Sequence, residues 1–217
     1  MSDIFQEVDE EVRRERLKQL WDRYGNIIIG IAFVLVLGIG GWRAYQWWEA
    51  KKAAENGARF EAALSLVAEG KHADAEAAFA RIAAEGTSGY RILARFQEAA
   101  ELARRDARAA VNVYDAIAAD SGVSPPLRDL ANIHAALLLV DTASLDEMRR
   151  RLEPISASGG SFRHSARELM AFAAWRAGNP EATRRWFEMI AADPESPAAI
   201  RTRVEMLIAL AAPDSKS

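Results

Sequence analysis

The 217-residue chain contains no cysteine. This absence excludes disulfide bonds, thiolate catalysis and zinc sites built on thiolates. Only three histidines are present, His72, His134 and His164, and they lie far apart without metal-ligand spacing. Because a metal site needs clustered ligands, we expect no metal and no cofactor.

Catalytic motifs are missing as well. The sequence has no phosphate-binding loop, no dinucleotide fingerprint and no nucleophile elbow. Carboxylates are numerous, but they alternate with arginines, as is typical of solvent-exposed helix faces; the basic run 149–151 beside Asp146 and Glu147 is an example. The sequence therefore predicts neither an enzyme nor a small-molecule substrate.

The chain also has no large excess of either charge and no strand pattern. The formal net charge is -3 and the pI is about 5.7, so the chain lacks the basic bias that indicates nucleic-acid binding. No segment after the first 50 residues alternates with period two, as a half-buried strand would. Half of the residues are hydrophobic, and alanine, glutamate, arginine and leucine favour helix. The predicted fold is all-α.

One long apolar run is present. From Ile27 to Trp42 the only polar side-chain group is the indole N–H of Trp42. Extended back to Tyr24, the run has about 19 residues, or roughly 28 Å of helix, which matches the hydrocarbon thickness of a bilayer. Aromatic residues, which favour membrane interfaces, flank it on both sides: Trp21 and Tyr24 before, and Trp42, Tyr45, Trp47 and Trp48 after. The pattern predicts a transmembrane helix over 24–48.

Two other interpretations explain this run less well. A buried core helix gives no reason for four of the six tryptophans to lie at its ends. A cleaved signal peptide needs a short basic leader, whereas the preceding residues are rich in acid. Gly38-Ile39-Gly40 could pass for a cleavage site, but a tryptophan follows almost at once. A retained single-pass anchor, preceded by a charged tail over 1–23, is the better explanation.

The distribution of basic residues hardly determines the orientation of the span. Five basic residues precede it and four follow, which gives only a small preference for a cytoplasmic N-terminus. An inverted topology with a cytoplasmic adaptor domain stays open.

The remaining sequence contains internal repeats. The segments "ADAEAAFARIAAEG", "ARAAVNVYDAIAADSG" and "NPEATRRWFEMIAADPESP" each place a small residue four positions before a large aromatic and an apolar residue three further on. The three sets are Ala75/Phe79/Ile82, Ala110/Tyr114/Ile117 and Ala182/Trp186/Met189. The small residues are 35 and 72 positions apart, so a degenerate unit is expected between the last two, around Met148 and Leu152.

These units predict stacked helical hairpins over 49–211. A small residue lets two helices approach, and the aromatic fills the adjacent space. Gly70 and Gly178-Asn179-Pro180 have the composition of turns between paired helices. About four hairpins would stack into a solenoid, followed by the capping helix "SPAAIRTRVEMLIALAA" and a disordered tail over 212–217. An unrelated alanine-rich helical bundle is the alternative.

The repeats resemble the tetratricopeptide repeat, most clearly in "LMAFAAWRAGNPEATRRWFEMIAADPESP". The whole organisation resembles the YfgM-like proteins, which are ancillary subunits of the bacterial Sec translocon. The resemblance is sharpest in "YGNIIIG" and in Gly41-Trp42-Arg43 followed by further aromatics and Gln46. The N-terminal "IFQEVDEEVRRERLKQLWDRYG" resembles the alphaproteobacterial branch.

The resemblance implies a protein of the bacterial inner membrane with its N-terminus in the cytoplasm and its repeats in the periplasm. It implies contact with translocon subunits, periplasmic chaperones or exported clients. We therefore expect a membrane-anchored scaffold that holds exported proteins or recruits chaperones. The alternative is an envelope-assembly or cell-division scaffold with no chaperone role.

A partner-binding groove is expected where the first helix of each hairpin lines the concave side. Counting back from the small residues gives nine candidates: Phe60, Leu64, Val67, Ile92, Arg95, Leu102, Arg167, Ala171 and Trp175. Their mixed apolar and basic character suits weak contact with extended chains. The alternative, that these side chains pack between hairpins, stays open.

Overall fold

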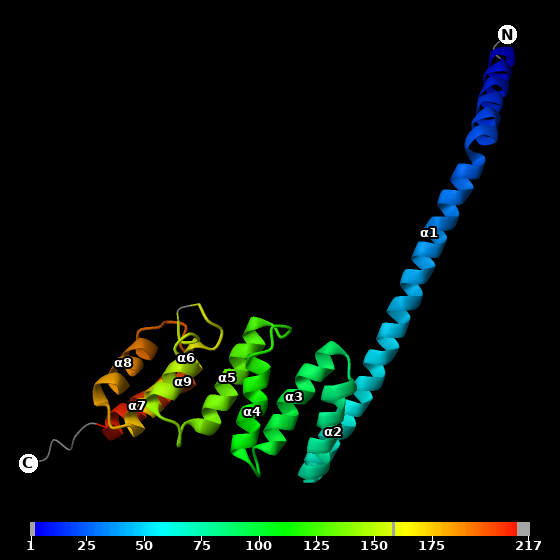
Figure 1. Ribbon diagram of the computed structural model, residues 1–217. Helices are drawn as coiled ribbons and strands as arrows, with labels where there is room; N and C mark the ends of the chain where they lie inside the picture. Colours follow the sequence, from blue (N-terminus) through cyan, green and yellow to red (C-terminus); the bar gives the residue numbers. More distant parts are fainter. Residues whose placement is uncertain (1–2, 158, 212–217) are drawn as a thin grey trace, which may run out of the picture. The chain divides into compact units, whose positions relative to one another are not determined.

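The computed structural model describes residues 3–157 and 159–211, and these residues form α-helices without any strand (Figure 1). The helices are α1 (Asp3–Ala68), α2 (His72–Glu85), α3 (Ser88–Leu102), α4 (Ala107–Ala118), α5 (Pro125–Leu139), α6 (Leu145–Leu152), α7 (Arg163–Arg176), α8 (Pro180–Ala191) and α9 (Ala198–Ala211). The predicted all-α fold is confirmed. The tail expected over 212–217 lies outside the described residues.

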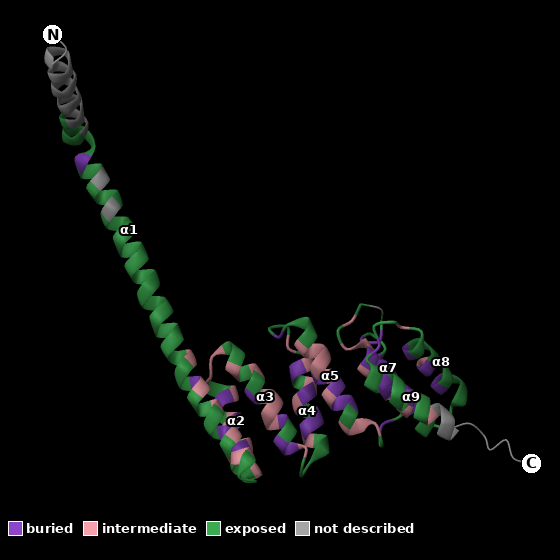
Figure 2. Cartoon of the chain, turned by 180° about the vertical axis from the view of Figure 1, so that it is seen from behind, coloured by how far each residue is buried: buried purple, intermediate pink, exposed green. Residues whose placement is uncertain are grey.

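The chain divides into two units, Met1–Glu55 and Asn56–Ser217. The first unit contains most of α1, and the large apolar side chains described in its apolar part are exposed (Figure 2). The most apolar 18-residue window of the candidate span has a mean hydropathy of 2.1, and none of it is buried. By length and composition, this helix is able to cross a membrane. It continues without a break through residues 23 and 48, so the predicted boundaries 23/24 and 48/49 fall inside one helix.

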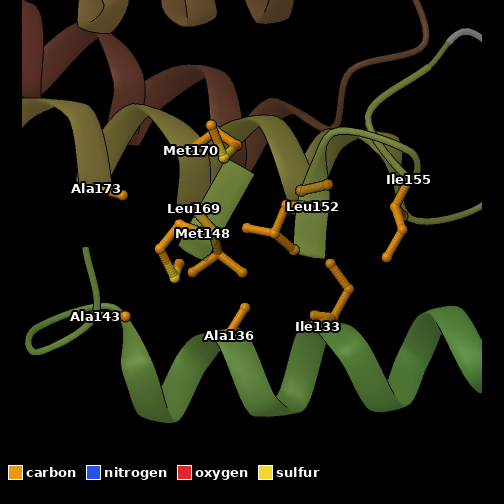
Figure 3. Packing of buried hydrophobic residues seen from close by; sticks show 10 residues of the cluster. Ile133, Ala136, Ala143, Met148, Leu152, Ile155, Leu169, Met170 and Ala173 are labelled. Atoms are coloured by element: carbon orange, nitrogen blue, oxygen red, sulfur yellow. The ribbon is translucent and has the colours of Figure 1, made fainter. Parts of the chain in front are cut away.

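The second unit is a series of helices in which each packs on the next. We call residues 56–68 of α1, together with α3, α5 and α7, the A helices, and α2, α4, α6 and α8 the B helices. Consecutive helices from α2 to α9 are in contact, and α7 also contacts α5 and α9. Four hydrophobic clusters hold this unit together, and each centres on one B helix between two flanking helices. In the cluster of α6, for example, Met148 and Leu152 lie between α5 and α7 (Figure 3).

The four B helices share one register, counted from the residue that precedes each helix. These N-cap residues are Lys71, Asp106, Ser144 and Asn179, and in all but Lys71 the side chain accepts a hydrogen bond from the backbone N–H three residues later, at 2.9–3.2 Å. Such caps satisfy N–H groups that the helix leaves unpaired. The residues four, eight and eleven positions after each cap are buried: Ala75, Phe79 and Ile82; Ala110, Tyr114 and Ile117; Met148, Leu152 and Ile155; Thr183, Phe187 and Ile190.

This register corrects the repeat assignment in α8. The set Ala182/Trp186/Met189 is wrong by one residue, because Phe187 and Ile190 are buried whereas Met189 is exposed and Trp186 is half-buried. The adjacent aromatics Trp186 and Phe187 make both registers plausible in the sequence. The cap decides between them, since Asn179 fixes where the helix begins.

Glycine turns join the first and last helix pairs, as predicted. Gly70 has φ +75° and Gly178 has φ +67°, a left-handed conformation that side chains disfavour. The following residue closes each turn: Lys71 N–H donates to the Leu66 carbonyl at 2.9 Å, and Asn179 N–H donates to the Ala174 carbonyl at 3.0 Å. These bonds satisfy carbonyls at the end of each A helix.

Helix α9 completes the last cluster. Its Ile200 and Val204 pack with Ala171 of α7 and with Phe187 and Ile190 of α8. Without this cover, the apolar face of α8 would be open to water. The helix therefore has the role expected of a terminal cap.

Candidate functional site

The three candidates from the first A helix pack inside the domain. Phe60, Leu64 and Val67 are half-buried and lie against the cluster of α2. The Phe60 ring centre is 5.3 Å from that of Phe79 and 5.9 Å from that of Tyr90. Their main contact is therefore with α2 and α3.

The candidates from α3 are held by neighbouring helices in a similar way. Ile92 packs against the cluster of α4, and Leu102 is buried. The Nη1 of Arg95 donates to Asp120 Oδ2 at 2.8 Å, and this hydrogen bond lowers the pKa of Asp120. Arg95 thus ties α3 to the turn after α4.

The candidates from α7 separate into buried and exposed residues. Arg167 and Ala171 are buried and have no surface to offer a partner in this conformation. Trp175 is 55% exposed, and of the nine candidates it alone is mostly exposed. The cause is the position of α7, which is packed by α5, α6, α8 and α9 and so has little open surface except near its end.

Two large, exposed apolar residues described on A helices were not among the candidates. Leu93 on α3 is 48% exposed, and Leu137 on α5 is 52% exposed. Leu137 and Trp175 share a register, because each is thirteen positions after the N-cap of its helix, Ser124 or Phe162. Trp175 was predicted, but no candidate was predicted on α5; the thirteenth position after the N-cap is the signal that identifies Leu137.

Leu137 and Trp175 also lie at the same end of adjacent helices. Helices α5 and α7 are in contact, and Arg176 donates a hydrogen bond to the Ala143 carbonyl just after α5. An exposed tryptophan and leucine at matching places give two neighbouring helices an apolar surface. We call Leu93, Leu137 and Trp175 the exposed A-helix residues.

Arg167 belongs to a cluster of charged groups between α7 and the turn after α8. Its guanidinium donates to the Ser156 carbonyl at 3.0 Å and to Asp193 Oδ2 at 2.9 Å. Arg163 donates to the same carboxylate at 2.9 Å and pairs with Glu195. These donors, Arg163 first, hold the pKa of Asp193 well below its ordinary value. The cluster holds the segment between α8 and α9 against α7, so its role is structural.

The three histidines occupy three separate places. His72 Nδ1 is 2.7 Å from Glu101 Oε2, and the His134 ring stacks on Tyr114 with centres 5.2 Å apart. Burial lowers the pKa of both His134 and His164. Among the side chains that the structure describes, no group of three or more acidic or histidine residues is placed to hold a metal ion.

A hollow of about 550 Å³ lies between the end of α1 and α2. Alanines 62, 63 and 78 form part of its wall, and Arg59, Arg81 and Glu85 also line it. An Arg59–Glu85 ion pair of 3.7 Å bridges the two helices. The hollow lacks the convergent buried polar groups that orient a small molecule.

The six predicted interface aromatics lie on α1 in the first unit. Trp21, Tyr24, Trp42, Tyr45, Trp47 and Trp48 are all exposed. Both groups bracket the apolar stretch of the helix, as their positions in the sequence require.

Comparison with known proteins agrees with the helix pairs. A family profile described as a tetratricopeptide repeat-like domain matches residues 18–206. A search of curated proteins and a search of solved structures each found no match.

Proposed function

The chain belongs to the tetratricopeptide repeat-like domain family, and from this premise we propose that it is a membrane-anchored scaffold that binds proteins through its A helices. Domains of this kind mediate protein–protein interactions and are typically non-catalytic. The observation that carries the proposal is the exposure of Leu137 and Trp175 at one register of two adjacent A helices. Exposed tryptophan is the residue type most enriched at binding hot spots.

The anchor is the apolar part of α1. Exposed apolar side chains cover this stretch, and burial in hydrocarbon would remove them from water. A single span would hold the repeat domain close to one membrane surface. Tethering raises the local concentration of a binding surface near the membrane, so weak individual contacts are enough to bind partners there.

The location and partners are proposed from the resemblance to YfgM-like proteins. "YGNIIIG" and "GWRAYQWW" at the two ends of the span support an inner-membrane protein with a cytoplasmic N-terminus and periplasmic repeats. In that place the domain would act beside the Sec translocon, where it holds exported proteins or recruits chaperones. The exposed A-helix residues are apolar, which suits clients that are still unfolded.

A photo-crosslinking amino acid at position 175 tests the binding surface. In full-length protein in intact membranes, we expect adducts with translocon subunits, chaperones or exported clients. The same group at Met189, an exposed residue of B helix α8, is the matched control and should give at least about fivefold fewer adducts. Equal yields at the two positions contradict the proposed surface, and adducts with wall synthases or divisome proteins instead support an assembly scaffold.

A reporter fusion tests the orientation. Alkaline phosphatase fused after Ser217 is expected to be active, because this enzyme works only outside the cytoplasm. A fusion truncated after Lys18, before the apolar run, should be inactive. If the fusion after Ser217 is inactive, the periplasmic placement is wrong and the adaptor faces the cytoplasm.

A further inference from the structure

Aromatic side chains surround α1 just after its most apolar stretch. Trp42, Tyr45, Trp47 and Trp48 are exposed, and at 100° per residue they point in different directions around the helix axis. Rings with one polar tip favour the headgroup region of a bilayer. We call these four residues, with Lys51 and Lys52, the aromatic collar.

The two lysines of the collar contact its tryptophans. Lys52 Nζ is 3.7 Å from the centre of the Trp48 ring, and Lys51 Nζ is 5.7 Å from the centre of the Trp47 ring. Both distances are within the range of cation–π attraction. Each lysine follows its tryptophan by four residues, so the two side chains lie on one helix face.

The direction of the lysine side chains determines how close their ammonium groups lie to the apolar stretch. Side chains on a helix lean toward its N-terminus, and here that direction is toward the apolar stretch. Each ammonium group is therefore drawn back over a ring and held at the depth of the indoles. A lysine that extended away from the membrane would place its charge in bulk water.

The charge of the segment is complementary to an anion. Between Trp42 and Lys52 there are three cationic residues, Arg43, Lys51 and Lys52, and one acidic residue, Glu49. We infer that the aromatic collar binds the phosphate groups of anionic phospholipids, with Lys51 and Lys52 as the residues that select them.

This inference rests on the proposed membrane anchor. The tryptophan rings hold the ammonium groups at the level of the headgroups, and the lysines provide the positive charge. The collar therefore distinguishes anionic from zwitterionic headgroups. Each lysine at a membrane surface contributes about fivefold to that preference. The wild-type protein should therefore prefer an anionic lipid by at least about tenfold.

Native mass spectrometry of the full-length protein in detergent measures this preference. The protein is mixed with equal amounts of phosphatidylglycerol and phosphatidylcholine, and the retained lipids are counted. We expect the preference for phosphatidylglycerol to fall below about threefold in the K51Q/K52Q variant. The K51R/K52R variant should keep it, since arginine also binds ring faces and phosphate.

Two further variants separate charge from position. The K71Q/R81Q variant removes two exposed cations from the second unit and is expected to behave like wild type. The W47L/W48L variant keeps both lysines but loses the rings, and its preference should fall severalfold. An unchanged preference in W47L/W48L would overturn the role of the rings.

Flotation with phosphatidylcholine liposomes tests the membrane anchor separately from the lipid site. Wild type and K51Q/K52Q should both float, because insertion depends on the apolar stretch. Failure of the wild type to float would refute the membrane anchor itself. Flotation without any preference for phosphatidylglycerol, or with a preference that K51Q/K52Q retains, would refute the lipid site alone.

Discussion

Replacing Phe79 by alanine is expected to lower the free energy of unfolding of the second unit by about 4 kcal/mol. Phe79 has no exposed surface and lies at the centre of the α2 cluster, with its ring 5.3 Å from that of Phe60. The substitution leaves a cavity between α2, α3 and the end of α1 that rigid helices fill only in part. Urea unfolding of the full-length protein in detergent, followed by far-UV circular dichroism, measures the loss.

Trp175→Ala is the matched control for this prediction. It also removes a large ring, but the ring is mostly exposed, so the free energy of unfolding should change by less than about 0.5 kcal/mol. The same variant should lose partner binding. A loss of stability as large as that of Phe79→Ala would show that Trp175 packs within the domain and is not a contact surface.

The second large effect is expected for Arg167→Met, which should cost about 3 kcal/mol. The Arg167 side chain is buried, and methionine cannot replace its hydrogen bonds to the Ser156 carbonyl and Asp193. The Ser156 carbonyl then loses this donor in a place that water reaches poorly, and Asp193 keeps Arg163 but loses its second guanidinium partner. In a thermal scan of the full-length protein, the midpoint for the second unit should fall by roughly 6–12 °C.

An exposed arginine provides the comparison. Arg149 pairs with Asp146 one turn away at 3.4 Å, and both side chains are exposed. Arg149→Met should therefore change the stability by less than about 0.5 kcal/mol. Equal losses for the two variants would mean that the cluster around Asp193 does not hold α7 to the turn after α8.

The same cluster gives stability a definite pH dependence. The pKa of Asp193 is lower in the folded chain than its ordinary value of 3.8, because Arg163 and Arg167 donate to its ionised form. The stabilisation is complete above that ordinary value and is lost as the pH falls below it. Asp193→Asn should therefore reduce the fall in melting temperature between about pH 5 and pH 3. If the melting temperature of the variant falls as much as that of the wild type, other carboxylates cause the loss of stability in acid.

The fold was largely predictable because its signals are local. Short stretches of sequence contain the alanine-rich helical composition and the turn glycines Gly70 and Gly178. The buried aromatics Phe79 and Tyr114 lie 35 positions apart, which is the length of one repeat. The α6 unit was harder to find because Met148 and Leu152 replace the small residue and the aromatic. In the α8 unit, two adjacent aromatics left a one-residue ambiguity that the Asn179 cap resolves.

The surface of the A helices was less predictable because it depends on neighbours distant in sequence. Arg167 and Ala171 have the spacing of groove residues, yet α7 is covered by helices that come both before and after it. Burial of this kind is a tertiary effect that no local pattern contains. The sequence predicts no groove residue on α5, because the third unit is degenerate, although Leu137 aligns with the predicted Trp175 from the starts of their helices.

The packing of each B helix between two flanking helices limits how such a chain can change in length. A single added helix would leave one apolar face without a neighbour, whereas an added A–B pair would reproduce every contact and still end on a helix like α9. The four caps at Lys71, Asp106, Ser144 and Asn179 are 35, 38 and 35 positions apart, which gives the size of one such pair. Duplication or loss of genetic material is therefore tolerated in steps of one hairpin, and related chains should differ in length by multiples of this unit.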